Sequence, residues 1–280
     1  MGSPYGYPEE SLKHYTCYRA AGPITVDGRL DEPSWQIVPK SDRFEDLESA
    51  GRPALFDTRA ALMWDDDFIY VGFWLQEPDV RATLTERDSK IWENNDVEVF
   101  IAGEDAYYEF EMNAFGTVME RFYIWQDRYV EAGYSEIPEF DLLGTELVDT
   151  LGGDWNWHAH PRGRRWSFRE WDLPGLQAAV HVNGTINKHD DVDVGWTAEI
   201  AIPWRGLVHL ADGRSLPARD GDTWRMDVSR FQWIADGRGG ETCPGWAWNS
   251  HGVYDSHIPD CFTYMHFSEQ VVGAGETDHG

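Results

Sequence analysis

The feature that most constrains the fold is a succession of short runs in which apolar and polar residues alternate. Asp, Gly and Pro clusters separate these runs, and alternation with a period of two residues is typical of half-buried strands. Only residues 32–38 and 203–210, each with a proline at its start, indicate helical turns. The sequence therefore predicts an all-β fold, a β-sandwich. The expected strands cover residues 58–64, 68–75, 95–101, 107–113, 117–124, 178–183, 196–202, 224–231 and 262–267.

The chain is expected to form one domain with two tails. Residues 1–14 and 269–280 are polar or Gly-rich without periodicity, which is typical of frayed ends. Between them, residues 15–268 form the expected single domain, and residues 126–171 interrupt its rhythm with an acidic stretch followed by aromatic and basic residues. We expect a long inserted loop there. Its His158 and His160 would share one face of an extended chain. They could therefore bind a metal as a pair, or belong to an ordinary polar loop.

Charge and composition exclude two classes of protein. The 280 residues carry 23 Lys+Arg against 50 Asp+Glu, a formal net charge of −27, which would repel a nucleic-acid backbone. Hydrophobic residues make up 41% of the chain, so it has the apolar side chains that a disordered acidic protein lacks. We therefore expect a folded protein that does not bind nucleic acid.

Cysteine usage and the N-terminal sequence bear on the compartment. Cys17, Cys243 and Cys261 show no C-x-x-C spacing, which excludes a zinc site of that kind, while a Cys243–Cys261 disulfide remains open. No run is long and apolar enough to span a membrane, and the first residues do not form a signal peptide. As read, the chain is expected in the cytoplasm, or outside it if a signal was removed.

The aromatic content gives the first indication of function. The chain has 15 Trp, 12 Tyr and 13 Phe among its many acidic residues. Flat apolar rings beside hydrogen-bond acceptors suit sugars, whose C–H faces stack and whose hydroxyls donate. An aromatic-rich β core is the alternative, because strands favour aromatic residues anyway.

An acidic hairpin is the most informative local feature. Residues 95–101 and 107–113 each have one apolar and one acidic face, and pairing of the apolar faces places Glu98 opposite Glu111 and Asp96 opposite Asn113. Like charges that face each other are destabilising. The carboxylates could therefore accept hydrogen bonds from a polyhydroxylated ligand, hold a hard cation such as Ca²⁺, or work as a catalytic pair; a solvated face neutralised by nearby arginines is the structural alternative.

The order of motifs resembles the family 9 carbohydrate-binding modules and their relatives. The resemblance extends from about residue 23 to 268 and rests on six phrases in order. They are PITVDGRLDEPSW, LMWDDDFIYVGFWLQEPDV, ERDSKIWENNDVEVFI, YYEFEMNAFGTV, GWTAEIAIPWRGL and WAWNSHGVYDSHIPDCFTYMHF. It implies a β-sandwich of the DOMON-like type, sugar recognition in a slot between aromatic side chains, and bound calcium (Ca²⁺) as a cofactor.

The resemblance also implies site residues. Trp92 matches a stacking tryptophan of these modules and Glu98 an acidic sugar contact, whereas Glu111 stands where they place an arginine. Their second stacking tryptophan falls near Ser256, with Tyr254 and Trp248 close by as candidates for the opposite wall. The expected ligand-binding residues are Trp92, Asp96, Glu98, Glu111, Asn113, Trp248 and Tyr254. The metal ligands are not identified by any motif spacing.

These observations predict non-catalytic binding of a mono-, oligo- or polysaccharide. The resemblance implies that a separate glycan-degrading enzyme is the partner, or that the chain is a free binding protein. An alternative is a glycoside hydrolase that uses Glu98 and Glu111 as its carboxylate pair. A third is a haem-binding DOMON-like electron-transfer domain with axial ligands among Met63, Met112, Met226 and His266.

Overall fold

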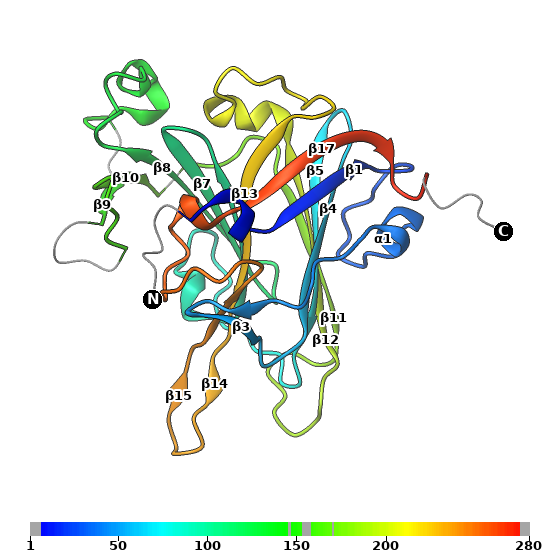
Figure 1. Ribbon diagram of the computed structural model, residues 1–280. Coiled ribbons are helices and arrows are strands. Elements are labelled where there is room, and N and C mark those ends of the chain that lie inside the picture. Colours follow the sequence, from blue (N-terminus) through cyan, green and yellow to red (C-terminus); the bar gives the residue numbers. More distant parts are fainter. Residues whose placement is uncertain (1–6, 145–146, 153–157, 170, 275–280) are drawn as a thin grey trace.

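Fifteen strands of the computed structural model form one continuous sheet that folds over into two packed halves (Figure 1). The structure describes residues 7–144, 147–152, 158–169 and 171–274. Strand β1 (His14–Arg19) joins the two halves, because it runs parallel both to β4 (Thr58–Trp64) and to β17 (Thr263–Val271). The predicted all-β sandwich is confirmed.

The first half of the sandwich contains the strands expected at residues 58–64, 68–75, 178–183 and 196–202. Its strands pair antiparallel in the order β11 (Gln177–Asn183), β12 (Gly195–Pro203), β5 (Phe68–Gln76) and β4. The turn 65–67 joins β4 to β5, as the DDD triplet predicts. On the outward face, Trp35 from helix α1 (Pro33–Ile37) packs into an apolar cluster with Met63 and Tyr70. This helix therefore closes the outer side of the first half.

The second half contains the acidic hairpin. Its order is β17, β13 (Thr223–Phe231), β6 (Asp96–Ala102), β7 (Ala106–Asn113), β8 (Val118–Trp125), β10 (Arg165–Phe168) and β9 (Val148–Leu151). Short strands extend it: β16 (Gly245–Ala247) pairs with β13 and with β2 (Glu45–Asp46), which pairs with β3 (Ser49–Pro53). A separate ribbon of β14 (Ile234–Ala235) and β15 (Glu241–Thr242) projects from the molecule (Figure 1).

The remaining regular elements are short 3₁₀ turns. Within the described residues, no helix is long and apolar enough to cross a membrane. The longest turn, η5, begins directly after Pro203, as the proline predicts. The turns are η1 (Glu9–Ser11), η2 (Ile91–Glu93), η3 (Tyr134–Glu136), η4 (Pro138–Phe140), η5 (Trp204–Leu210) and η6 (Pro259–Cys261).

The main core lies between the two halves. Alternate side chains of facing strands point into it, and those of Leu62, Phe73, Val99, Phe110 and Val228 have no exposed surface. The same alternation sends the other side chains of β6, β7 and β8 outward. That outward face is not open to solvent, because an aromatic cluster that includes Phe262 from the C-terminal segment covers part of it.

The segment 126–171 differs from the expected long loop. Its described residues include η3, η4 and two strands, and β10 pairs with β8, so the sheet continues beyond β8. Phe140 stacks on Phe122 with ring centroids 4.8 Å apart, and the Tyr134 hydroxyl donates to the His209 carbonyl at 2.8 Å. Aromatic side chains within the acidic stretch thus anchor it to the core, and its strands are too short to show periodicity.

The structure also tests the disulfide that the sequence left open and the expected end of the domain. In the part of the chain that the structure describes, Cys17, Cys243 and Cys261 form no disulfide with one another, so the Cys243–Cys261 bond left open above does not form. The last strand, β17, continues past the expected domain end at 268 to Val271.

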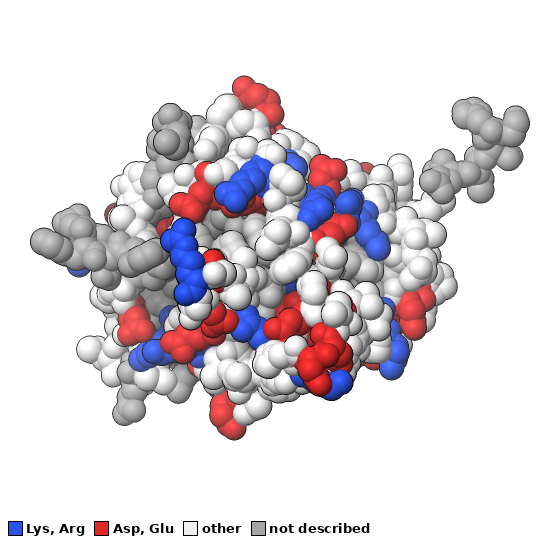
Figure 2. Space-filling view, turned by 90° about the horizontal axis from the view of Figure 1, so that it is seen from below, with Lys and Arg blue, Asp and Glu red and all other residues white. Residues whose placement is uncertain are grey.

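Acidic and basic side chains lie interspersed on the face seen in Figure 2, so the charge of −27 is not gathered into one patch there.

Candidate functional site

A cavity of about 430 Å³ lies on the outward face of β6, β7 and β8. Strand alternation places Glu98, Glu109 and Glu111 side by side on its floor, with Arg121 and Tyr123 contributed by the next strand. Residues 254–257, from the loop after β16, line the opposite side, and Trp92 and Trp233 form walls. The cavity thus combines several carboxylates with aromatic rings.

The acidic hairpin adopts the register expected from its alternation. Glu98 faces Glu111 and Asp96 faces Asn113. The face is buried rather than solvated, with Asp96, Glu98 and Glu111 no more than 3% exposed, because residues from the C-terminal segment lie over it. Burial, followed by mutual repulsion of the neighbouring carboxylates, raises the pKa of Glu98 and Glu111 well above the usual range.

Glu109 is the carboxylate with the best set of partners. His257 Nε2 lies 3.2 Å from its Oε1, and the Tyr123 hydroxyl donates to its Oε2 at 2.5 Å. Burial alone would raise the pKa of Glu109, but the contacts with His257, Arg121 and Tyr123 lower it. Burial lowers the pKa of His257, so we assign a neutral ring that donates from Nε2 and accepts from Tyr107 at Nδ1 (3.2 Å).

Asp255 positions the loop that covers the cavity. Its Oδ1 accepts the backbone N–H of His257 at 2.8 Å and contacts His158 Nδ1 at 2.6 Å. Although burial opposes it, these two histidines lower the pKa of Asp255 to about 2. His160 instead contacts Asp260 at 3.0 Å, so His158 and His160 face different partners and do not form the metal pair considered above.

Aromatic side chains form the rim of the cavity. The 3₁₀ turn η2 buries Ile91 and leaves Trp92 37% exposed, with the Arg121 guanidinium 4.9 Å from its ring centroid. Across the cavity, the Tyr254 hydroxyl donates to the Cys243 carbonyl at 2.5 Å, and the Tyr254 ring packs edge-on against Phe231. Two aromatic walls therefore flank the carboxylates, one of them partly open to solvent.

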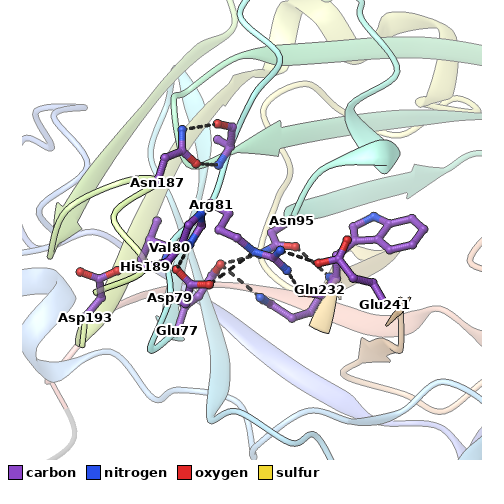
Figure 3. A network of polar contacts seen from close by, with 12 residues as sticks. Glu77, Asp79, Val80, Arg81, Asn95, Asn187, His189, Asp193, Gln232 and Glu241 are labelled. Atoms are coloured by element: carbon purple, nitrogen blue, oxygen red, sulfur yellow. Dashed lines mark hydrogen bonds and ion pairs between the residues drawn. The ribbon is translucent and has the colours of Figure 1, made fainter. Parts of the chain in front are cut away.

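A polar network that includes Glu77, Arg81 and Asn95 (Figure 3) contacts the backbone of the third aromatic wall, Trp233. The Asn95 side-chain oxygen accepts the backbone N–H of Trp233 at 2.8 Å, and Arg81 donates to the Trp233 carbonyl. Arg81 also pairs with Glu241 at 2.6 Å, which ties β15 to the end of β5. At the centre of the network, buried Glu77 accepts hydrogen bonds from Asn95 and other side chains, so the rim near Trp233 is rigidly supported.

The structure brings together most of the predicted site residues. Trp92, Glu98, Glu111 and Tyr254 line the cavity, and Asp96 is buried beside Glu98 on the same strand face. These residues come from η2, two strands and a distant loop. The predicted grouping of an indole with carboxylates therefore exists in the fold.

Two predicted site residues lie elsewhere and have structural contacts. Asn113 has no exposed surface, and its side-chain oxygen accepts the backbone N–H groups of Phe115 and Thr117 in the turn after β7. Trp248 is 3% exposed in the main core, where it packs edge-on against Tyr15. Neither lines the cavity, because the chain turns inward at Trp248 and closes a tight turn at Asn113.

Some cavity residues were not predicted from the sequence. Glu109, Arg121 and Tyr123 could have been found by extending the outward phase of the hairpin to the next strand, since Glu109 faces Arg121. Trp233, Asp255 and His257 lie in irregular segments, where periodicity carries no signal.

A second, larger hollow of about 980 Å³ lies over the outward face of the first half. Its indole, Trp74, is covered by Lys40, whose Nζ lies 3.7 Å from the ring centroid, and Arg59 pairs with Asp57 at 3.1 Å. The side chains of this hollow thus partner one another. The 430 Å³ cavity is the stronger candidate, because its carboxylates are short of donors.

Comparison with known proteins points to one family. Residues 52–159 match the model of carbohydrate-binding family 9. The matched range includes the cavity residues from Trp92 to Tyr123. No curated protein matches the sequence. One similar solved structure is a proposed carbohydrate-binding protein from Bacteroides uniformis, with 16% identity over 91% of this chain and 99% of the other, and a TM-score of 0.55.

Two further similar structures are family 9 modules from Caldicellulosiruptor kristjanssonii. One, in complex with cellotriose, has 13% identity, covers 93% of this chain and 97% of its own, and has a TM-score of 0.52. The other, in complex with glucose, has 12% identity, 91% and 97% coverage, and a TM-score of 0.51. At such identities the likeness establishes the fold. Residues 52–159 are thus similar to carbohydrate-binding family 9, and the whole chain has the β-sandwich fold of these structures.

Proposed function

We propose that the chain binds a saccharide non-covalently in the 430 Å³ cavity and does not cleave it. One observation carries the proposal: partly exposed Trp92 stands beside buried Glu98 and Glu111 in one enclosed space. An indole offers a face for the C–H side of a sugar ring, and carboxylates accept hydrogen bonds from its hydroxyls. Tyr254 and Trp233 stand where they would limit the ring from other sides.

The size of the cavity and the similar structures support this function. Small-molecule sites commonly have volumes of about 300–1,000 Å³ and are lined by aromatic groups with a few polar ones. Two structures of similar fold are complexes with glucose and cellotriose. These two sugars are therefore the first probes for this chain.

The test is a titration of intrinsic tryptophan fluorescence with glucose, cellotriose and a panel of other neutral sugars. Binding predicts a saturable shift, and replacement of Trp92 by Ala is expected to lower affinity at least about 100-fold by removing the stacking face. Trp74→Ala is the matched control, since Trp74 is a half-buried tryptophan of the other half. Equal affinity in both variants, or no response to any sugar, would refute the proposed site.

A glycoside hydrolase is the second candidate, because Glu98 and Glu111 face each other in the cavity with oxygens no more than 4.8 Å apart. Such enzymes need one protonated and one ionised carboxyl, with pKa values pushed apart. Here burial and mutual repulsion raise both pKa values together, which favours binding. Chromatography of each sugar mixture decides: shortened products would establish cleavage.

The remaining expected partners stay predictions. A separate glycan-degrading enzyme would be sought by co-purification with polysaccharide-active proteins of the same source. For the haem alternative, Met63, Met112 and Met226 are fully buried in apolar clusters, a setting in which methionine packs as core filler. A visible absorption spectrum of the purified chain tests that alternative directly.

A further inference from the structure

Three carboxyl groups meet at one end of the cavity, and two of their oxygens lack a donor. Asp96 and Glu98 project from the same face of β6, and Glu111 lies opposite Glu98 on β7. Ser229 donates to Glu98 Oε2 at 2.8 Å. Among the described residues, Asp96 Oδ2 and Glu111 Oε2 are buried and have no hydrogen-bond partner. Buried polar groups are normally paired, so these oxygens indicate that a donor is missing.

Positive charge is also scarce at this end of the cavity. Arg230 pairs with Glu77 at 3.0 Å, and both side chains are buried. Arg121 acts on Glu109 as well as on Glu111, so its single charge is shared. One shared guanidinium cannot balance several carboxylates. A ligand that brings a positive charge therefore complements this end better than a neutral ligand of the same shape.

The spacing of the three carboxyl groups suits an ammonium group. One oxygen from each of Asp96, Glu98 and Glu111 lies within 4.8 Å of the other two. An ammonium group on a carbon has three N–H donors, directed to the corners of a tetrahedron. With N–H···O⁻ distances of about 2.8 Å, the three acceptor oxygens lie about 4.6 Å apart. A sugar hydroxyl donates only one hydrogen, so it would serve one of these oxygens at a time.

We propose that the cavity prefers a sugar with a free amino group, such as glucosamine, and that its ammonium group lies between Asp96, Glu98 and Glu111. This inference rests on the proposed saccharide binding and names the class of sugar. Glu98 and Glu111 line the cavity, and Trp92 stands where it would carry the apolar face of the ring. An acetylated amine is neutral and keeps one N–H, so N-acetylglucosamine would leave acceptor oxygens unpaired.

The same groups couple sugar binding to protons. In the free protein, burial raises the pKa of Asp96, Glu98 and Glu111 well above the usual range, so the three groups retain protons. A neighbouring ammonium group favours their ionised form. Binding of glucosamine should therefore release protons, and binding of N-acetylglucosamine should release fewer. Affinity for glucosamine should rise with pH until the amino group of the sugar loses its own proton.

The experiment is a calorimetric titration of the whole chain with glucosamine, N-acetylglucosamine and glucose at pH 7. EDTA is present, because a divalent cation would compete for the same oxygens. We expect glucosamine to bind at least about tenfold more tightly than either neutral sugar. Repetition in buffers of different ionisation enthalpy measures the protons released. Equal affinity for glucosamine and N-acetylglucosamine would overturn the inference.

Variants assign the preference to the carboxyl groups. Glu111→Gln should lower glucosamine affinity at least about tenfold and bring the glucosamine-to-glucose ratio close to one. Glu98→Gln is the second variant if the first fails to fold, as judged by near-ultraviolet circular dichroism. The matched control is Glu104→Gln, which changes an exposed carboxylate in the turn of the same hairpin and should leave the ratio unchanged. A preference for glucosamine that survives in folded Glu111→Gln and Glu98→Gln would overturn the assignment.

The outcomes separate this inference from the proposed function. Neutral sugars that bind in a Trp92-dependent way, with no gain for glucosamine, would refute only the preference for an amino group. A chain that binds neither neutral nor amino sugars would refute the proposed function, and this inference with it.

Discussion

Buried carboxylates lie on the outward faces of both halves of the sandwich, and they differ in how well they are partnered. In the first half, Glu199 accepts hydrogen bonds from the Trp35 indole at 2.8 Å and from two backbone N–H groups, those of Asp27 and Gly28, at 3.0 Å each. In the second half, Asp96 and Glu111 each keep an oxygen without a partner among the described residues.

This difference shows what marks a binding site in this molecule. Glu199 and Glu111 are both at most 2% exposed, so burial does not distinguish them. Glu199 is closed in by α1 and the chain before it, whereas Glu111 borders a cavity. A buried group with all its donors stabilises the fold, and one that lacks donors is available to a ligand.

The largest expected effect is loss of stability on removal of the partnered carboxylate. Glu199→Ala leaves an indole N–H and two backbone N–H groups unpaired, and should lower the free energy of unfolding by about 3 kcal/mol or more. Chemical denaturation measures this. Glu199→Gln, which keeps one acceptor oxygen, should cost less, and sugar affinity should not change. A fully stable Glu199→Ala variant would contradict the comparison.

The second largest expected effect is a pH-dependent contribution of Asp255 to the free energy of unfolding. Its folded pKa of about 2 lies below the ordinary 3.8, so the folded state binds the proton more weakly than the unfolded state. Asp255 therefore stabilises the fold above pH 4, and this stabilisation, about 2 kcal/mol, is lost as the pH falls from 4 towards 2. Denaturation of the parent and Asp255→Asn should differ at pH 5 and converge at pH 2. A difference that stays constant with pH would refute this assignment.

A smaller effect of opposite sign is expected for the unpartnered carboxylate. At pH 7, Glu111→Gln should raise the free energy of unfolding by about 1 kcal/mol, because a neutral amide avoids both the burial of a charge and the cost of protonating a carboxyl whose pKa is raised. Thermal and chemical unfolding measure this. Glu104→Gln, on the exposed turn, should have no effect. A loss of stability in Glu111→Gln as large as that in Glu199→Ala would remove the distinction between the two faces.

The smallest expected effect concerns the rim. Arg81→Ala removes a partly exposed pair with Glu241 and the contact that holds the Trp233 carbonyl. Stability should fall by no more than about 1 kcal/mol, while sugar affinity falls a few-fold as the wall loosens. Arg52→Ala, which breaks an exposed pair with Asp46, is the control and should leave affinity unchanged. Unchanged affinity in Arg81→Ala would show that the wall is rigid without this contact.

Periodicity predicted the parts of the molecule that local chemistry determines. The alternation in 95–101 and 107–113 was enough for the strands, their register and the pairing of Glu98 with Glu111. It could not show that this face is buried, because the covering residues lie in an irregular segment more than a hundred positions away. For the same reason Trp248 was expected in the opposite wall, although it packs in the core.

The pairing of β1 with β17 also has a consequence for the nascent chain. His14 lies opposite Tyr264, so the strand that joins the two halves lacks one neighbour until the segment around Tyr264 has left the ribosome. At about 5–20 residues per second, that interval is on the order of ten to fifty seconds. Such non-local pairing slows folding, and the unpaired edge of β1 is exposed meanwhile to association with other chains. Production of the protein should therefore benefit from chaperones that shield strand edges during synthesis.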